Sequence, residues 1–131
     1  MTRGSLLIAM AKKKVLVVDD NHDTLFLVCE ILRENDYECL TADTPQEGLR
    51  IAERDCPNLI LLDLMLPGMS GFGFIREKNR NKKLKDIPVV ILSVINDDEV
   101  EGALADLGAV AYVRKVCNHQ ELLTSVAANV A

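Results

Sequence analysis

The chain has 131 residues, of which 49% are hydrophobic and 27% charged, and its formal net charge is −5 at pH 7. This length and composition fit one soluble globular domain and leave no room for a second. The negative charge argues against direct binding to the phosphate backbone of nucleic acids, and no apolar run is long enough to cross a bilayer. We therefore expect neither nucleic acid nor membrane as a direct partner.

The ends of the chain and its cysteines give weaker signals. Residues 1–11 carry a very short apolar patch with Arg3, which is poor for a signal peptide and is interpreted as an irregular leader or expression remnant. Residues 12–131 are interpreted as the folded domain. The cysteines are scattered without the close pairs of a zinc site, so we expect reduced thiols in a cytoplasmic protein: Cys29, Cys39, Cys56 and Cys117.

Strand and helix patterns alternate five times along the chain. Leu59–Leu62 is an unbroken apolar run, which is typical of a central strand of a parallel sheet covered on both faces. The expected strands are Lys14–Val18, Tyr37–Thr41, Asn58–Leu62, Ile87–Ser93 and Ala109–Val113.

Capping residues predict where the intervening helices begin. Thr44-Pro45-Gln46-Glu47 combines an N-cap threonine, a proline at the first helical position and a glutamate at the third, which form a capping box. Gly108 is expected to close the fourth helix. The other expected N-caps are Asn21, Ser70, Asn96 and Asn118.

Five such units with short connections leave few topologies, because parallel crossovers are nearly always right-handed. The sequence therefore predicts an α/β protein, a single doubly wound three-layer α/β/α sandwich with a five-stranded parallel sheet and five helices. Its strand ends carry polar residues that should meet at one edge of the sheet, where such folds bind ligands: Asp19, Asp20, Asp63, Ser93 and Lys115.

Three carboxylates at one edge would repel one another by roughly 4 kcal/mol per pair at about 4 Å and an effective dielectric near 20. A hard divalent cation would offset this repulsion, and an oxygen-only site favours Mg²⁺ over zinc. A carboxylate beside such a cation, a hydroxyl and an ammonium group is suited to phosphoryl transfer onto aspartate.

These residues resemble the receiver domain of two-component response regulators, which belongs to the CheY-like superfamily. The segments VLVVDD, LILLDLMLPGMSG, VVILS and GAVAYVRK occur in the order and spacing of that family. The resemblance extends from about Lys14 to the C-terminus. It implies a sheet in the order 2-1-3-4-5, a cytoplasmic location, and a signalling switch rather than an enzyme, capable at most of self-catalysed phosphotransfer and dephosphorylation.

The resemblance also implies a role for each strand-end residue. Asp63 would accept a phosphoryl group from a phosphohistidine on a sensor histidine kinase or phosphotransfer protein. Mg²⁺ would be held by Asp19, Asp20, Asp63 and the backbone carbonyl of Met65. Ser93 and Lys115 would bind the phosphoryl group. Ser93 and Tyr112 would switch the face formed by the fourth helix, fifth strand and fifth helix, which would contact a downstream effector, an output domain or a second copy of the chain.

Two residues depart from the family pattern. Val116 follows Lys115 where the family usually has a cis proline, and a cis bond before valine would cost about 2.5–4 kcal/mol, so we expect a trans bond and a rearranged Lys115 loop. Val94 follows Ser93 where the family usually has a small residue, and it is expected to slow phosphorylation and dephosphorylation.

Two enzyme or cofactor-binding classes with a similar fold would need residues that this chain lacks. A haloacid dehalogenase-like phosphatase would need a second acid where Met65 stands, and a dinucleotide-binding domain would need a glycine-rich turn where Asp19 and Asp20 stand. Both are disfavoured. The alternative left open is a pseudo-receiver that docks a partner without being phosphorylated.

Overall fold

A computed structural model describes residues 12–64, 66, 68–94, 98–115 and 118–131 of the chain. The strands are β1 (Lys13–Val18), β2 (Tyr37–Ala42), β3 (Leu59–Leu62), β4 (Val89–Ser93) and β5 (Ala111–Arg114). The helices are α2 (His22–Glu34), α3 (Pro45–Asp55), α4 (Gly71–Arg80), α5 (Asp98–Asp106) and α6 (His119–Asn129). All strand pairs are parallel and their order is β2-β1-β3-β4-β5, which confirms the predicted fold class.

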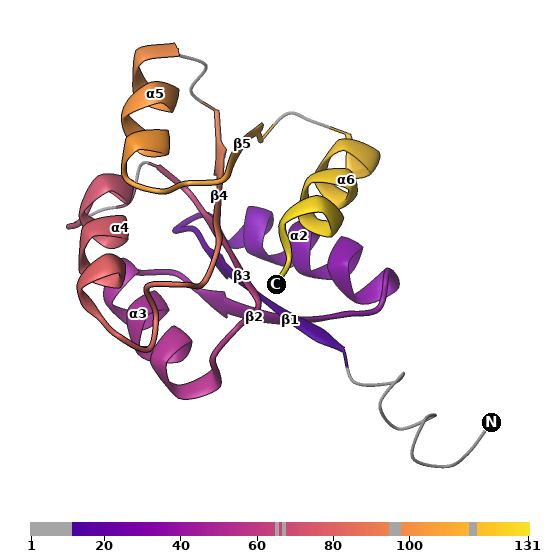
Figure 1. The fold of residues 1–131 in the computed structure, drawn as a ribbon. Helices are drawn as coiled ribbons and strands as arrows, with labels where there is room; N and C mark the ends of the chain where they lie inside the picture. Colours follow the sequence, from indigo (N-terminus) through magenta and orange to yellow (C-terminus); the bar gives the residue numbers. More distant parts are fainter. Residues whose placement is uncertain (1–11, 65, 67, 95–97, 116–117) are drawn as a thin grey trace.

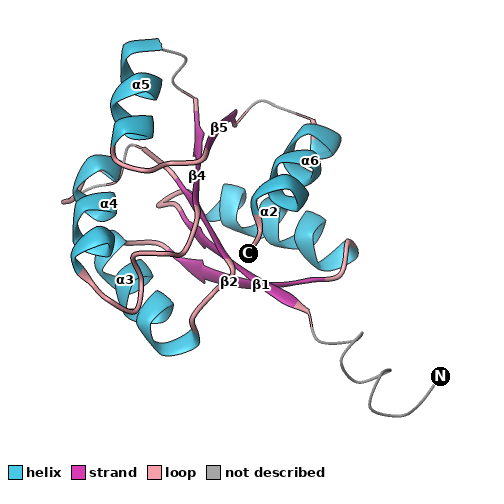
Figure 2. Ribbon diagram, viewed as in Figure 1, coloured by secondary structure: helices cyan, strands magenta, loops and turns pink. Residues whose placement is uncertain are grey.

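The helices cover both faces of the sheet. Helices α2 and α6 lie on one face, and α3, α4 and α5 lie on the other (Figure 1). Coloured by secondary structure, the central sheet separates these two helical layers (Figure 2). In the described part of the chain, no helix combines the length and the apolar character that a membrane span requires.

Alternate residues of the central strands supply one hydrophobic core on each face. Ile60 and Leu62 of β3 pack in the core beneath α3, α4 and α5. Leu59 and Leu61 pack in the core beneath α2 and α6. Every side chain of β3 is fully buried, as the unbroken apolar run predicts, because neither face of this strand meets water.

The capping predictions are largely confirmed. The side chains of Asn21, Thr44, Ser70 and Asn118 each accept a hydrogen bond from the backbone N–H three residues on. These bonds satisfy N–H groups that have no partner inside the helix. The predicted cap at Asn96 lies outside the described residues.

The sequence placed the starts of three strands too early, and β3 begins at Leu59 rather than Asn58. β4 begins at Val89 rather than Ile87, because Pro88 has no N–H to offer a neighbouring strand. β5 begins at Ala111 rather than Ala109, because the N–H of Ala109 donates to the carbonyl of Leu104 and so belongs to the end of α5. Gly108, with φ of +100°, makes this reversal.

The prediction that the cysteines are all reduced thiols is wrong for one pair. Cys29 of α2 and Cys39 of β2 form a disulfide, with their Cα atoms 5.5 Å apart. The two residues are far enough apart in sequence to hide the pairing, but α2 packs directly over β2 and turns both side chains into the same core. Among the described residues, Cys56 is a free thiol and is exposed.

Candidate functional site

Strand register brings the first two carboxylates together. Val18 of β1 pairs with Leu62 of β3, so the residues that follow, Asp19 and Asp63, leave neighbouring strands at the same level. The N–H of Asp63 donates to the carbonyl of Val18 at 2.9 Å, which extends the ladder to the start of the site. Asp19 and Asp63 are 1% and 5% exposed, unusually low values for carboxylates.

Backbone hydrogen bonds hold the loop that carries the acidic pair. The N–H of Asp19 donates to the carbonyl of Ala42 in β2 at 3.0 Å. Oδ1 of Asp19 accepts the N–H of Asn21, the N-cap of α2, at 2.9 Å. The loop is therefore fixed between the end of β2 and the start of α2, and the side chain of Asp20 remains exposed.

The three predicted carboxylates form a cluster. One carboxylate oxygen from each of Asp19, Asp20 and Asp63 can be chosen so that the three oxygens lie within 4.8 Å of one another. Oδ2 of Asp19 is buried and, apart from an ion pair with Lys115, has no hydrogen-bond partner among the described residues. An all-oxygen cluster with such an atom fits a hard cation such as Mg²⁺.

Lys115 reaches this cluster from the end of β5. Its Nζ lies 2.6 Å from Oδ2 of Asp19 and 3.4 Å from Oδ2 of Asp63. Burial acts to lower the pKa of the ammonium, but the two carboxylates, Asp19 foremost, outweigh it and raise the pKa. Lys115 thus brings a positive charge to Asp63, the predicted phosphoacceptor, although Val116 follows it where the family usually has proline.

Ser93 ends β4, which pairs with β3, and it is fully buried. Its carbonyl accepts the N–H of Lys115 at 2.8 Å, so the two residues predicted to bind a phosphoryl group are joined through their backbones. The segments that carry the two residues are therefore in direct backbone contact.

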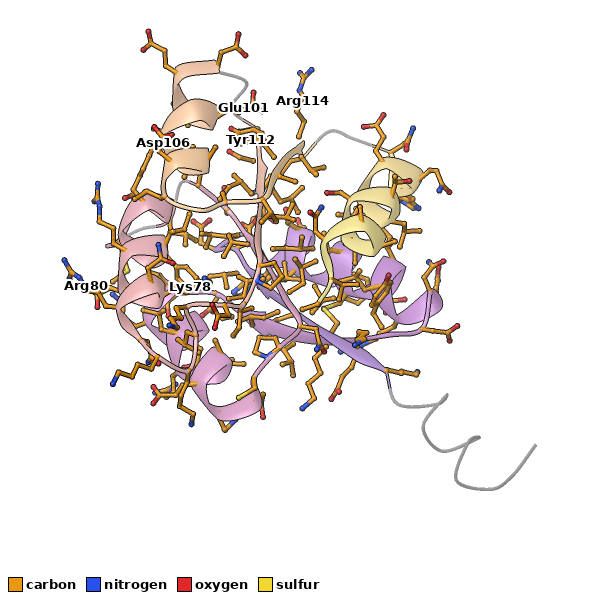
Figure 3. The ribbon with its side chains drawn as sticks, in the orientation of Figure 1. Lys78, Arg80, Glu101, Asp106, Tyr112 and Arg114 are labelled. Carbon is orange, nitrogen blue, oxygen red and sulfur yellow. A yellow bond between two sulfur atoms is a disulfide. The ribbon has the colours of Figure 1, made fainter. Side chains whose placement is uncertain are left out.

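Tyr112 pairs with Ile91 in the β4–β5 register and packs against the core beneath α5. Figure 3 shows it on the side of β5 nearest α5, close to Glu101, whereas Arg114 extends away from the sheet. A groove of about 300 Å³ between α5 and β5 is lined by both Tyr112 and Glu101. Tyr112 therefore contacts both the core beneath α5 and the groove at the surface of α5.

Not every predicted feature can be placed. Met65 lies outside the described residues, and so does Val116 with the peptide bond that precedes it. Val94 is described and is 64% exposed at the rim of the site.

Two features of the structure were not predicted from the sequence, a buried lysine and a disulfide. Lys78 of α4 is only 4% exposed and donates through Nζ to the carbonyl of Lys85 at 2.8 Å. Its spacing from Phe74 and Ile75, which are buried, is the signal that could have revealed it. The second feature is the Cys29–Cys39 disulfide, which no local pattern marks.

Comparison with known families agrees with this geometry. The family model described as "response regulator receiver domain" matches residues 15–127. The chain therefore belongs to the response regulator receiver domain family, whose members act in two-component signalling.

Named relatives are transcriptional regulators. The chain is 33% identical over 116 residues to the phosphate regulon transcriptional regulatory protein PhoB of Escherichia coli K12, covering 88% of this chain and 51% of that protein. It is 37% identical over 113 residues to the probable transcriptional regulator ycf27 of Cyanophora paradoxa, covering 85% of this chain and 45% of that protein. The chain thus spans about half the length of these relatives.

Solved structures with the same fold include single receiver domains. The chemotaxis protein CheY4 of Vibrio cholerae matches with a TM-score of 0.87 and 28% identity, covering 92% of this chain and all of that one (100%). A CheY-like receiver domain protein from Methanospirillum hungatei matches with a TM-score of 0.83 and 28% identity, covering 90% of this chain and 93% of that one.

Proposed function

We propose that this domain is a phosphorylation-dependent switch in which Asp63 accepts a phosphoryl group from a phosphohistidine on a sensor kinase or phosphotransfer protein. The observation that carries the proposal is the buried cluster of Asp19, Asp20 and Asp63 with the ammonium of Lys115 inside it. Bringing like charges together lowers the stability of the fold, so such clusters are often found at functional sites. This cluster combines a nucleophile with the groups needed to bind a phosphoryl group.

In the transfer, a carboxylate oxygen of Asp63 attacks phosphorus, and the bond from phosphorus to the imidazole nitrogen breaks. The imidazole leaves with the electron pair. Lys115, whose Nζ is 3.4 Å from Oδ2 of Asp63, would neutralise charge on the phosphoryl oxygens. Mg²⁺ held by Asp19, Asp20, Asp63 and the Met65 carbonyl would supply further neutralisation of those oxygens and of the carboxylates.

Phosphorylation replaces one negative charge on Asp63 with roughly two and adds acceptor oxygens. A state in which the Ser93 hydroxyl and the Lys115 ammonium bind those oxygens gains charge-assisted hydrogen bonds. Because Ser93 and Lys115 are joined by a backbone hydrogen bond, both loops would move together. Tyr112 would then carry the change to the surface formed by α5, β5 and α6, called here the α5–β5–α6 face.

We further propose that the domain works in the cytoplasm as a switch rather than as an enzyme with its own substrate. The α5–β5–α6 face would contact an effector, an output domain or a second copy of the chain as a homodimer. Since the named relatives are transcriptional regulators about twice as long, contact with DNA is assigned to such an output domain and not to this one.

A second candidate function is a pseudo-receiver that docks a partner without phosphorylation. Val94 favours it, because a branched side chain, 64% exposed, stands at the rim of the site directly after Ser93. The complete set of three carboxylates with Lys115 weighs against it.

Intact mass after incubation with acetyl phosphate and Mg²⁺ separates the two functions. We expect a phosphate-sized gain in the wild type that is absent without Mg²⁺ and absent in Asp63→Asn. Asp43→Asn is the matched control, because it removes an exposed carboxylate that lies outside the cluster. No gain in the wild type, with Mg²⁺ binding retained, would refute the switch and support the docking module.

A further inference from the structure

The Cys29–Cys39 disulfide joins the two elements that border the acidic loop. Cys29 lies in α2 and Cys39 in β2, and they are 3% and 8% exposed. Figure 1 shows α2 running across the face of the sheet that contains β2. The bond is therefore an internal cross-link between a helix and the edge strand beneath it.

The same two elements anchor Asp19. β2 provides the Ala42 carbonyl that accepts the Asp19 N–H, and the N-cap of α2 provides the N–H that Asp19 Oδ1 accepts. Asp20 lies between these anchors, directly before Asn21. Relative movement of α2 and β2 would consequently displace the two carboxylates that complete the cluster with Asp63.

A surface groove links the disulfide to the end of β2. Its volume is about 540 Å³, and its lining includes Cys29 from the cross-link, Ala42 and Asp43 from the end of β2, and His22 from the start of α2. An exposed ion pair between His22 Nε2 and Asp43 Oδ2, 3.1 Å long, spans the same gap but is expected to contribute little. The disulfide is the stronger tie across this groove.

We propose that Cys29–Cys39 is a redox modification site that controls how tightly the Asp19–Asp20 loop binds its cation. The proposal deepens the proposed function and rests on it. The reductant is a dithiol of the thioredoxin class or two molecules of a monothiol such as glutathione. The two reductant sulfurs are oxidised to a disulfide, while Cys29 and Cys39 together take two electrons and two protons and become thiols.

The physical basis is the order that the cross-link imposes. Disulfides in a reducing cytoplasm are mostly transient and sensory, which suits a regulatory bond better than a permanent one. Without the bond, α2 and β2 are held by packing, by the exposed His22–Asp43 ion pair and by the hydrogen bonds of Asp19, and local opening at this edge of the sheet becomes easier. A loop that opens more often must be ordered again on cation binding, and this lowers the affinity.

The experiment uses the full chain carrying Cys56→Ser and Cys117→Ser, so that only the proposed pair remains. The oxidised and dithiothreitol-reduced forms are verified by maleimide labelling and intact mass, which should count no label and two labels respectively. Mg²⁺ affinity is then measured by calorimetry, and exchange of the Asp19 amide hydrogen is measured without Mg²⁺.

We expect reduction to weaken Mg²⁺ binding by about fivefold or more, the lower end of typical coupling between linked sites. The Asp19 amide should exchange faster in the reduced form, whereas the Leu61 amide in the centre of the sheet should not change. A Cys29→Ala/Cys39→Ala variant should match the reduced form and should not respond to dithiothreitol. If that variant does not fold, the reduced protein itself provides the comparison.

Equal Mg²⁺ affinity and equal Asp19 exchange in the two redox forms would overturn the proposal while leaving the receiver function intact, provided that both forms still take up phosphate from acetyl phosphate. Failure of both forms to take up phosphate would instead refute the proposed function, and with it any redox control of that function.

Discussion

The ammonium of Lys115 lies closer to Asp19 than to the predicted phosphoacceptor: Nζ is 2.6 Å from Oδ2 of Asp19 and 3.4 Å from Oδ2 of Asp63. In this arrangement the lysine occupies the oxygen that a divalent cation would use. Lys115 therefore both neutralises the carboxylate cluster and competes with the cation that the cluster is proposed to bind.

From this competition we predict that Lys115→Met binds Mg²⁺ more tightly than the wild type does, by about tenfold, equivalent to ~1.4 kcal/mol. In the absence of Mg²⁺ the variant should be less stable, because the carboxylates lose their counter-ion. Calorimetric titration and urea unfolding with and without Mg²⁺ test both statements. Arg114→Met is the control, since it removes a neighbouring exposed charge; unchanged affinity in Lys115→Met would contradict the prediction.

The hydroxyl of Ser93 is predicted to couple the phosphoryl group to the α5–β5–α6 face. We expect Ser93→Ala to take up phosphate, because Asp63 and Lys115 are intact, but to lose most of the phosphorylation-induced change in amide hydrogen exchange at Tyr112. Thr41→Ala is the control, because it removes a hydroxyl from the exposed end of β2. An equal response of the wild type and Ser93→Ala would exclude the coupling role.

The burial of Lys78 is expected to make the free energy of unfolding depend on pH in the alkaline range. Burial lowers its pKa below the usual 10.5, with Asp86 partly opposing the shift. Figure 3 contrasts Lys78 with Arg80, which extends outward from the end of the same helix. Between the lowered pKa and 10.5 the unfolded chain binds the proton more strongly than the folded one, so the free energy of unfolding rises with pH in that window.

The variant Lys78→Met removes this contribution. At pH 7 we expect it to equal the wild type to within about 1 kcal/mol, because relief from burying a charge offsets the lost hydrogen bond to Lys85. As pH rises toward 10.5, the wild type should gain stability relative to the variant in urea unfolding. Lys82→Met, at an exposed position, removes the same charge as a control. A constant difference across this pH range would disprove the explanation.

Replacement of two helical glycines by alanine should change the free energy of unfolding in opposite directions. A Cβ on Gly48 of α3 would lie 2.9 Å from Cγ2 of Val18 and 3.1 Å from Cε2 of Phe74, whereas one on Gly102 of α5 would meet nothing within 4 Å. Replacing glycine by alanine inside a helix stabilises the helix by about 1 kcal/mol, but overpacking a core destabilises the protein by about 1–3 kcal/mol.

We therefore predict that Gly102→Ala raises the free energy of unfolding by about 0.5–1 kcal/mol and that Gly48→Ala lowers it. Thermal and urea unfolding of the two variants measure the difference, and each variant serves as the control for the other. Stabilisation by Gly48→Ala would show that α3 can move away from β1 without cost.

Features that depend on residues close together in the chain could be predicted from the sequence, and features that depend on distant residues mostly could not. The apolar run of β3 and the caps at Thr44 and Asn118 were predictable, because they depend on residues next to one another in the chain. The convergence of Asp19, Asp63 and Lys115 was also predictable, since parallel strands end at one edge. The boundary error at 87–88 arose because Pro88 has no N–H for strand pairing, and the error at 109–110 arose because the N–H of Ala109 bonds to Leu104 at the end of α5.

Only the tertiary structure decided which partners meet across elements. It showed that Lys115 pairs more closely with Asp19 than with Asp63, that Lys78 is turned inward, and that Cys29 and Cys39 are bonded. Each of these depends on how a helix or loop sits over the sheet, which is fixed by the packing of the two cores. The sequence by itself determined the fold and the gathering of three carboxylates and Lys115 at one edge of the sheet, because periodicity and strand-end position encode both. The contacts among these side chains depend on the tertiary structure.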